Sequence, residues 1–317
     1  MTVTETTPEA AQKIPEHPKS LLLRMDRMPH IWCSRCGIGI AVGCFASAME
    51  KTGLSPDDIT ITSGIGCTGR VAGYVKADSF HTTHGRAIPF TVGLTLARPD
   101  LKHVIFSGDG DLISIGGNHF IHAARRNQNM LVVCVNNFTY AMTGGQLAPT
   151  TPVGARATTA PYGSFERPFS LPTLAISAGA SYVARWTSLH IRRVTDSMTE
   201  ALQRDGFRFI EILAPCSTIY ARRNKLGTGL DLMKYYYENS VIDHDASAED
   251  LDIGFQSKIV VGKFVDKDRP SYGKSMHDHF SKILGNKYKP PTNGKTEVEK
   301  SWSGYDSNEA GTDEVQA

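Results

Sequence analysis

The sequence lacks the features that mark membrane, secreted and nucleic-acid-binding proteins. No apolar run approaches the roughly 20 residues that a helix needs to cross a bilayer. The N-terminal MTVTETTPEAAQKIPEHPKS has no apolar h-region of a secretory signal. No run of Lys and Arg with interleaved aromatic residues occurs, and the net charge is only +2. We therefore expect a cytoplasmic protein with no membrane and no nucleic-acid partner.

The chain also contains no internal repeat, and its composition predicts one large domain with polar ends. A length of 317 residues, 40% of them hydrophobic, is ample for a single domain with a sizeable core. We predict a flexible arm at residues 1–20 and the domain that carries the chemistry at residues 21–230. A C-terminal extension at 231–288 is expected to pack against another chain, followed by a disordered tail at 289–317.

The clearest structural pattern is a strand, a helix and a second strand in the middle of the chain. Residues 104–106 are an apolar run that ends in Gly108-Asp109-Gly110. Residues 115–124 then show helical spacing, and a second apolar run at 130–135 stops at Asn136-Asn137. This order is typical of a parallel βαβ unit. The fold class predicted is α/β, with a parallel sheet flanked by helices.

Polar residues follow both predicted strands, at the edge where parallel sheets bind their ligands. Asp109 offers a carboxylate oxygen, Asn137 an amide oxygen and Thr139 a backbone carbonyl. Magnesium prefers about six hard oxygens and shares its shell with phosphate and water. The neighbouring glycines allow backbone N–H groups to approach phosphate. A Gly-Asp-Gly alone fits an ordinary turn, but Asn-Asn after a further 25 residues favours an ion site.

Six cysteines also need an explanation, since cytosolic proteins rarely use them in disulfides. Cys44 and Cys134 lie within apolar segments and are expected to be buried thiols. Four others lie on glycine-rich or post-strand loops: Cys33, Cys36, Cys67 and Cys216. Four thiolates suit either zinc or an iron–sulfur cluster, and the spacing does not decide between them.

The GDG–NN pattern resembles the thiamine diphosphate-binding motif. The longer segments GDGDLISIGGNHFIHAARRN and NNFTYAMTGGQ resemble the β subunit of the 2-oxoacid:ferredoxin oxidoreductases, and the resemblance runs from about Trp32 to Asn224. It implies a thiamine diphosphate-binding domain with Mg²⁺ held by Asp109, Asn137 and the carbonyl of Thr139. It also implies a [4Fe–4S] cluster held by four thiolates: Cys33, Cys36, Cys67 and Cys216.

One segment departs from the family pattern. Cys-Ser-Arg-Cys stands where these proteins commonly have Cys-Pro-Gly-Cys. Both expected cluster ligands in this segment, Cys33 and Cys36, are still present. The departure puts the shape of the turn in question, and it brings the charge of Arg35 near the expected cluster.

The resemblance also implies an activity and its partners. The reaction is a reversible, coenzyme A-dependent oxidative decarboxylation of a 2-oxoacid, with electrons passing through the cluster to ferredoxin. Thiamine enzymes need a second domain for the pyrimidine end, and this chain has room for only one. An α subunit is therefore implied, in an αβ or (αβ)2 complex, and the chain alone is expected to be inactive.

Further residues are assigned as expectations. The ARWTSLHIRR and CSTIYARRN segments resemble members that act on 2-oxoglutarate, and Arg70 is the candidate contact for its distal carboxylate. His84, in a segment with Arg86 that resembles the family's HGR, and Met142 complete the catalytic candidates. Besides the magnesium ligands, the cofactor-binding candidates are Ser63, Gly64, Ile65, Gly66, His84, Gly108, Gly110, Asp111, Thr143 and Gly144.

Three alternative functions stay open from the sequence. The same chemistry on pyruvate or another 2-oxoacid uses the same motifs. A non-redox thiamine diphosphate decarboxylase accounts for the GDG–NN pattern if the cysteines hold structural zinc. An iron–sulfur electron carrier or scaffold accounts for the cysteines if the GDG–NN pattern is accidental.

Overall fold

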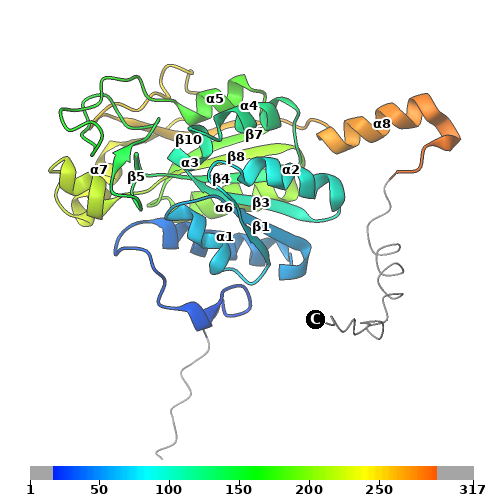
Figure 1. The fold of residues 1–317 in the computed structure, drawn as a ribbon, viewed down its shortest axis with the longest axis horizontal. Helices are drawn as coiled ribbons and strands as arrows, with labels where there is room; N and C mark the ends of the chain where they lie inside the picture. The colour runs from blue at the N-terminus through cyan, green and yellow to red at the C-terminus, as the bar shows by residue number, and fades with distance from the viewer. Residues whose placement is uncertain (1–16, 291–317) are drawn as a thin grey trace, which may run out of the picture.

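The computed structural model describes residues 17–290. Their main feature is an eight-stranded sheet with strand order β2–β1–β3–β4–β8–β7–β10–β9 (Figure 1). The first six strands in this order are parallel, β10 is antiparallel to β7, and β9 is parallel to β10. The predicted α/β fold with a parallel sheet is confirmed. The strands are β1 (Ile59–Ser63), β2 (Asp78–His81), β3 (Lys102–Gly108), β4 (Met130–Asn136), β7 (Tyr182–Thr187), β8 (Phe207–Leu213), β9 (Ser240–Ile242) and β10 (Ile259–Asp266).

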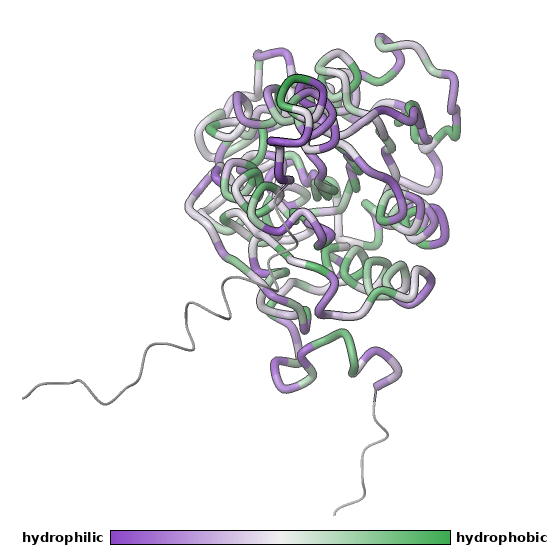
Figure 2. Tube along the Cα trace, turned by 90° about the vertical axis from the view of Figure 1, so that its right-hand side faces the viewer, coloured by the Kyte–Doolittle hydropathy of each residue, from purple (hydrophilic) through white to green (hydrophobic). Residues whose placement is uncertain are grey.

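Helices cover both faces of the sheet, as Figure 1 shows. One layer contains α1 (Ile38–Thr52) and α6 (Ile191–Gln203). The other contains α2 (Ala87–Ala97), α4 (Gly117–Arg125) and α5 (Leu171–Ser177). Hydrophilic and hydrophobic stretches alternate along the trace (Figure 2), and α4 and α6 each bury one face and expose the other.

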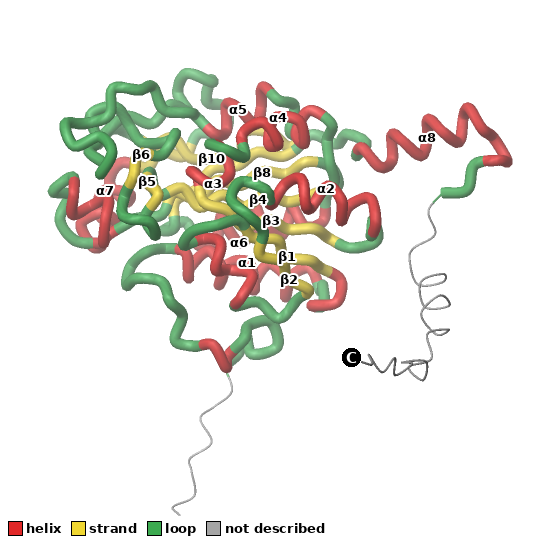
Figure 3. The backbone as a smooth tube through the Cα atoms, in the orientation of Figure 1, coloured by secondary structure: helices red, strands yellow, loops and turns green. Residues whose placement is uncertain are grey.

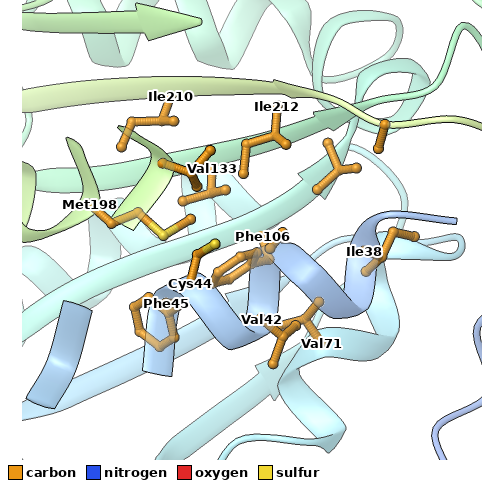
Figure 4. Close-up of a cluster of buried hydrophobic side chains, with 14 of the residues drawn as sticks. Ile38, Val42, Cys44, Phe45, Val71, Phe106, Val133, Met198, Ile210 and Ile212 are labelled. Carbon is orange, nitrogen blue, oxygen red and sulfur yellow. The ribbon is translucent and has the colours of Figure 1, made fainter. Parts of the chain in front are cut away.

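The central strands are buried on both faces. Every residue of β4 and of β8 is buried, which explains why their sequences are nearly continuous apolar runs. Phe106 and Val133, paired across β3 and β4, belong to the core under α1 and α6, whereas Ile105 and Val132 belong to the core under α2, α4 and α5. Cys44 lies beside Phe106 in the first core (Figure 4), and Cys134 is also buried. The prediction that these two thiols are buried is confirmed.

The shorter elements gather at the carboxyl ends of the parallel strands, where Figure 3 shows long loops around β5, β6 and α7. They position the site described below. They are η3 (Thr68–Gly73), α3 (Asp109–Ile113), β5 (Thr139–Tyr140), β6 (Gln146–Leu147), η4 (Ser217–Ala221) and α7 (Gly229–Asn239). Three further one-turn helices are η1 (Met25–Arg27), η2 (Pro56–Asp58) and η5 (Gly285–Lys287).

The C-terminal extension contributes to the sheet of its own chain, because β10 pairs with β7 and β9 pairs with β10. The helix α8 (Tyr272–Leu284) that follows has no buried residue and extends away from the body (Figure 1). Packing of the extension on another chain stays a prediction. Most of the predicted arm and tail, residues 1–16 and 291–317, lies outside the described residues. Between residues 17 and 290, no helix is both long and apolar enough to cross a membrane.

Candidate functional site

Two adjacent cavities open at the carboxyl ends of β1, β3, β4 and β8. The first is lined by residues of the GDG–NN pattern, including Asp109 and Asn137. The second, of about 240 Å³, is lined by four loop cysteines. Four residues line both cavities and separate them: Cys67, Asn137, Ala141 and Met142. The topology therefore brings the two sequence motifs to one place.

Asp109 begins α3 directly after β3, and only 2% of its surface is exposed. Burial raises the pKa of its carboxyl group to about 6, although hydrogen bonds from Thr150 and from the backbone amides of Asp109, Asn137 and Gly110 oppose the rise. A buried carboxylate with this cost of ionisation is stabilised by a nearby cation.

Asn137 supplies a second oxygen to the same cavity. Its side-chain Oδ1 is buried and has no hydrogen-bond partner among residues 17–290. A buried polar atom without a partner is costly unless a ligand satisfies it. Thr139, whose carbonyl is the third predicted ligand, lines the same cavity from β5. Hard oxygens of this kind are the donors that Mg²⁺ prefers, so the residues fit the ion that the sequence pattern implies.

Asp111 fastens the surrounding loops to one another. Its carboxylate accepts hydrogen bonds from the Ser107 hydroxyl (2.6 Å) and from the Gly85 amide (2.8 Å). His84 Nδ1 lies 2.7 Å from Asp111 Oδ1. A Cβ at Gly64 would lie only 1.7 Å from Asp111 Oδ2. Asp111 thus fixes the loop after β1 and the loop before α2 against α3.

Tyr140 covers the Gly-Asp-Gly turn from above. Its hydroxyl donates to the carbonyl of Gly110 (2.9 Å), and a Cβ at Gly110 would lie 2.5 Å from its ring. His84 packs at 5.9 Å from the same ring, between ring centroids, and its side chain is 38% exposed. His84 therefore lines the cavity and lies against the Asp111 carboxylate, at ion-pair distance but without hydrogen-bond geometry.

Not every predicted residue faces the first cavity. Those that line it are Ile65, Gly66, His84, Gly108, Asp109, Gly110, Asp111, Asn137, Thr139, Met142 and Thr143. Ser63, at the end of β1, and Gly64 and Gly144, in the loops after β1 and β5, are not part of this lining. The hydroxyl of Thr143, expected to donate to a phosphate, donates to Gln146 Oε1 (2.7 Å). Met142, which lines both cavities, is half exposed.

Arg70 lies away from both cavities. It is part of η3 and lines a separate hollow of about 280 Å³ with Arg27, Tyr74 and His81. Arg86 also lies outside the first cavity, where its guanidinium donates to the carbonyls of Gly85 and Ile115. The structure thus places a basic hollow beside the site and no basic side chain in its lining other than His84.

Three residues of the first cavity carry no sequence signal that would have marked them. Thr68 and Tyr140 line it, and Thr150 donates a hydrogen bond to the Asp109 carboxylate. Thr150 is 41 residues from Asp109 in the sequence. Its role depends on the loop after β6 folding back over α3, and local spacing does not encode that contact.

The four loop cysteines line the second cavity together. Hydrogen bonds tie their loops: Trp32 Nε1 donates to the carbonyl of Cys67 (2.7 Å), and the Ser217 hydroxyl donates to the carbonyl of Ser34 (3.3 Å). Burial, with a smaller contribution from the neighbouring thiols, raises the pKa of Cys36 to about 12 and that of Cys67 to about 11. Binding of a metal centre to these thiols would therefore have to release their protons.

The four thiols lie close enough to influence one another's pKa values. Among residues 17–290, no three His, Cys, Asp or Glu side chains are arranged to hold a single metal ion. In a zinc site all four sulfurs lie about 2.3 Å from one ion, whereas a [4Fe–4S] cluster is held by one thiolate on each iron. The four thiols that line this cavity are the number of protein ligands that either centre requires.

The Cys-Ser-Arg-Cys segment forms a tight turn, with the Cys36 amide donating to the Cys33 carbonyl (3.2 Å). Arg35 occupies its third position with φ of 63°. Positive φ at this position is the mark of a type II turn, in which Pro-Gly is the common central pair. The segment therefore reaches the turn shape that Pro-Gly favours without either residue.

Comparisons with known proteins agree with this geometry. The profile "Thiamine pyrophosphate enzyme, C-terminal TPP binding domain" matches residues 64–212. The chain is 48% identical to the 2-oxoglutarate synthase subunit KorB of Methanocaldococcus jannaschii, over 84% of this chain and 98% of that protein. It is 36% identical to the β subunit of 2-oxoacid:ferredoxin oxidoreductase 2 of Aeropyrum pernix, over 59% of this chain and 60% of that protein. The chain belongs to the β subunits of the 2-oxoacid:ferredoxin oxidoreductases.

A solved structure of the family has the same fold. The 2-oxoglutarate:ferredoxin oxidoreductase of Magnetococcus marinus, with 2-oxoglutarate, coenzyme A and succinyl-CoA bound, superposes with a TM-score of 0.76. The match covers 94% of this chain and 99% of that chain at 28% identity. The family resemblance inferred from the GDG–NN segments is thus confirmed.

The contact between Gly64 and Asp111 predicts the effect of one added methyl group. Gly64→Ala should displace the Asp111 carboxylate and loosen both loops that it holds, lowering the melting temperature and the thiamine diphosphate content of the purified protein. Gly117→Ala is the matched control, because nothing lies within 4 Å of a Cβ there and Gly117 is helical. Thermal unfolding and cofactor analysis measure both effects, and an unaltered Gly64→Ala protein would contradict the clamp role of Asp111.

Proposed function

We propose that this chain is the β subunit of a 2-oxoglutarate:ferredoxin oxidoreductase. The reaction converts 2-oxoglutarate, coenzyme A and two oxidised ferredoxins into succinyl-CoA, CO₂, two reduced ferredoxins and one proton. The observation that carries the proposal is the shared wall between the Asp109–Asn137 cavity and the four-cysteine cavity. Neighbouring sites for an organic cofactor and a redox centre are what a decarboxylation coupled to electron transfer requires.

The chain's residues have separate tasks in this proposal. Asp109, Asn137 and the Thr139 carbonyl hold Mg²⁺, and the glycine backbone of residues 108–110 faces the diphosphate. Cys33, Cys36, Cys67 and Cys216 hold a [4Fe–4S] cluster. Thiamine diphosphate, when bound, supplies the carbanion and electron-sink chemistry of the reaction. His84, oriented by Asp111 and partly exposed to the cavity, is positioned to exchange a proton with the substrate.

A partner subunit follows from the size of the cofactor cavity. The space enclosed beside Asp109 is about 40 Å³, whereas pockets for whole cofactors measure roughly 300–1,000 Å³. The cavity in this chain is thus much smaller than a whole coenzyme. We propose that an α subunit closes the rest in an αβ or (αβ)2 complex, that ferredoxin accepts the electrons, and that the complex is cytoplasmic, where thiols stay reduced.

The activity of the assembled complex tests the function directly. Co-purified with its α subunit, the chain should reduce ferredoxin or a viologen dye when 2-oxoglutarate and coenzyme A are both present. The chain alone should show no such activity, because it encloses only part of the cofactor. Absence of dye reduction by a complex that contains thiamine diphosphate, iron and sulfide would refute the proposal, as would turnover by the chain alone.

The cluster assignment has its own test. Serine substitution at Cys33, Cys36, Cys67 or Cys216 should lower iron and acid-labile sulfide together, because each residue would supply one ligand. Cys44→Ser and Cys134→Ser are the matched controls, since both thiols are buried away from the cavity. Metal analysis also separates the alternatives, because zinc without sulfide would favour a structural site. Iron loss in the control variants would contradict the assignment of the four loop cysteines as cluster ligands.

Arg70 is the proposed determinant for a dicarboxylic substrate. Its guanidinium, in the hollow with Arg27 and His81, makes no hydrogen bond or ion pair within the described part of the chain. A charge-assisted hydrogen bond contributes about 1.5–3 kcal/mol, so Arg70→Ala should raise KM for 2-oxoglutarate about 10–100-fold and leave KM for pyruvate nearly unchanged. Arg125→Ala, on the exposed surface of α4, is the control. Equal changes for both substrates would exclude Arg70 from substrate selection.

A further inference from the structure

Three buried polar side chains form a connected series of contacts next to the turn that carries the proposed ion ligand Asn137. The roles assigned above do not involve this series. It consists of Asn136 at the end of β4, Glu211 on β8 and Arg185 on β7. All three residues are at most 1% exposed. Two opposite charges and an amide so deep in the sheet need a reason, because burying them is costly even when they are paired.

The turn next to this series of contacts has an unfavourable backbone conformation. Phe138 has φ of 63°, a region that residues other than glycine rarely adopt. Its amide donates to Asn136 Oδ1 (3.1 Å), and its carbonyl accepts from the Thr151 hydroxyl (2.7 Å). Asn137, a proposed ion ligand, lies between Asn136 and Phe138 in the sequence. The direction in which Asn137 projects therefore depends on the Asn136 side chain holding Phe138 in place.

Glu211 determines how that side chain is oriented. Asn136 Nδ2 donates to Glu211 Oε1 at 2.7 Å. This contact turns the amide so that its oxygen, and not its nitrogen, faces the Phe138 amide. An isolated asparagine amide could rotate and lose the contact to Phe138. Paired with Glu211, it has one orientation.

Arg185 in turn fixes Glu211. The two residues are register partners on β7 and β8, and Arg185 Nε donates to Glu211 Oε2 at 2.5 Å. Arg185 Nη1 donates to the backbone carbonyl of Leu251 at 2.8 Å. Leu251 is fully buried in the C-terminal extension, between β9 and β10. The chain of contacts thus runs from the extension through two strands to the turn.

The geometry leads us to propose that Arg185 and Glu211 are positioning residues for the divalent cation. They hold the Asn136–Phe138 turn in the conformation that presents Asn137, and the Leu251 carbonyl anchors them from the C-terminal extension. This inference rests on the proposed function, since it takes Asn137 to be an ion ligand. It gives the extension a task within its own chain, in addition to any contact with a partner.

The experiment uses the αβ complex stripped of Mg²⁺ and thiamine diphosphate by chelation and gel filtration. Mg²⁺ is titrated at saturating thiamine diphosphate, and the coenzyme retained by the protein is measured. In Glu211→Gln, either orientation of the new amide sets two donors against each other. Arg185→Lys keeps the charge but replaces the planar fork, whose Nε and Nη1 donate separately to Glu211 and Leu251, with a single ammonium nitrogen. Both variants should raise the Kd for Mg²⁺ about 10–100-fold, as loss of groups that orient metal ligands does.

Arg208→Lys is the matched control. Arg208 is an equally buried arginine on β8, but it donates to Asn129 and to the carbonyls of Met130, Ala201 and Arg204 at the other end of the sheet. It should lower the melting temperature of the stripped complex and leave the Kd for Mg²⁺ unchanged. If the Glu211→Gln chain does not form the αβ complex, the Kd for Mg²⁺ of the Arg185→Lys complex tests the inference alone.

Two results would overturn the inference in different ways. If the variants lower the melting temperature as Arg208→Lys does and bind Mg²⁺ within about twofold of the wild-type Kd, the chain of contacts only stabilises the fold. If the wild-type complex retains no thiamine diphosphate at any Mg²⁺ concentration, the proposed function itself fails, and this inference fails with it.

Discussion

Parallel pairing of β3, β4 and β8 is the constraint from which the whole site follows. It sets Gly108 opposite Val135 and Asn136 opposite Leu213, and beyond the paired residues the Ala214 amide still donates to the Asn136 carbonyl (3.0 Å). The ends of β3 and β4 are about 28 residues apart in the sequence, and those of β4 and β8 about 77, yet all three strand ends lie side by side. A shift of this register would separate the carboxylate, the amide and the last cysteine loop from one another at once, because all three leave the sheet at the same edge.

Burial of acidic groups is the second feature that unites the two cavities. Asp109 and the thiols of Cys36 and Cys67 all have raised pKa values, with desolvation as the main cause. Burial shifts each of these groups toward its neutral form when no cation lies beside it. A divalent ion or an iron centre reverses that preference and displaces protons. The acidic groups at this edge of the sheet are costly to ionise without cations. The same groups therefore favour the binding of cations there.

The sequence predicted the α/β fold class and the unit formed by β3, α4 and β4, because these central strands are buried on both faces and read as apolar runs. It did not predict β2, whose four residues are mostly exposed and carry no apolar pattern, nor α7 and α8. Within the site, the Gly-Asp-Gly turn and the cysteine loops were recognisable from local spacing. Thr150 and the separate hollow of Arg70 were not, because both depend on how distant loops fold over one another. Glu211 gave a signal that was overlooked, since a charge inside a buried strand needs a buried partner.

Arg35 shows how tertiary contacts replace a local preference. A left-handed conformation costs a residue other than glycine about 1–2 kcal/mol, and Pro-Gly would form the same turn without that cost. The rest of the fold supplies the compensation: Ser217 donates to the carbonyl of Ser34, and Gly229 at the start of α7 leaves room for the Arg35 side chain, since a Cβ there would lie 2.8 Å from Arg35 Cβ. The spacing of Cys33 and Cys36 is thus set by the turn itself, and the turn is held by the loop that carries Cys216. The two ends of the cysteine site depend on each other, which is why Cys33 and Cys36 line one cavity with Cys216 although Ser-Arg stands between them.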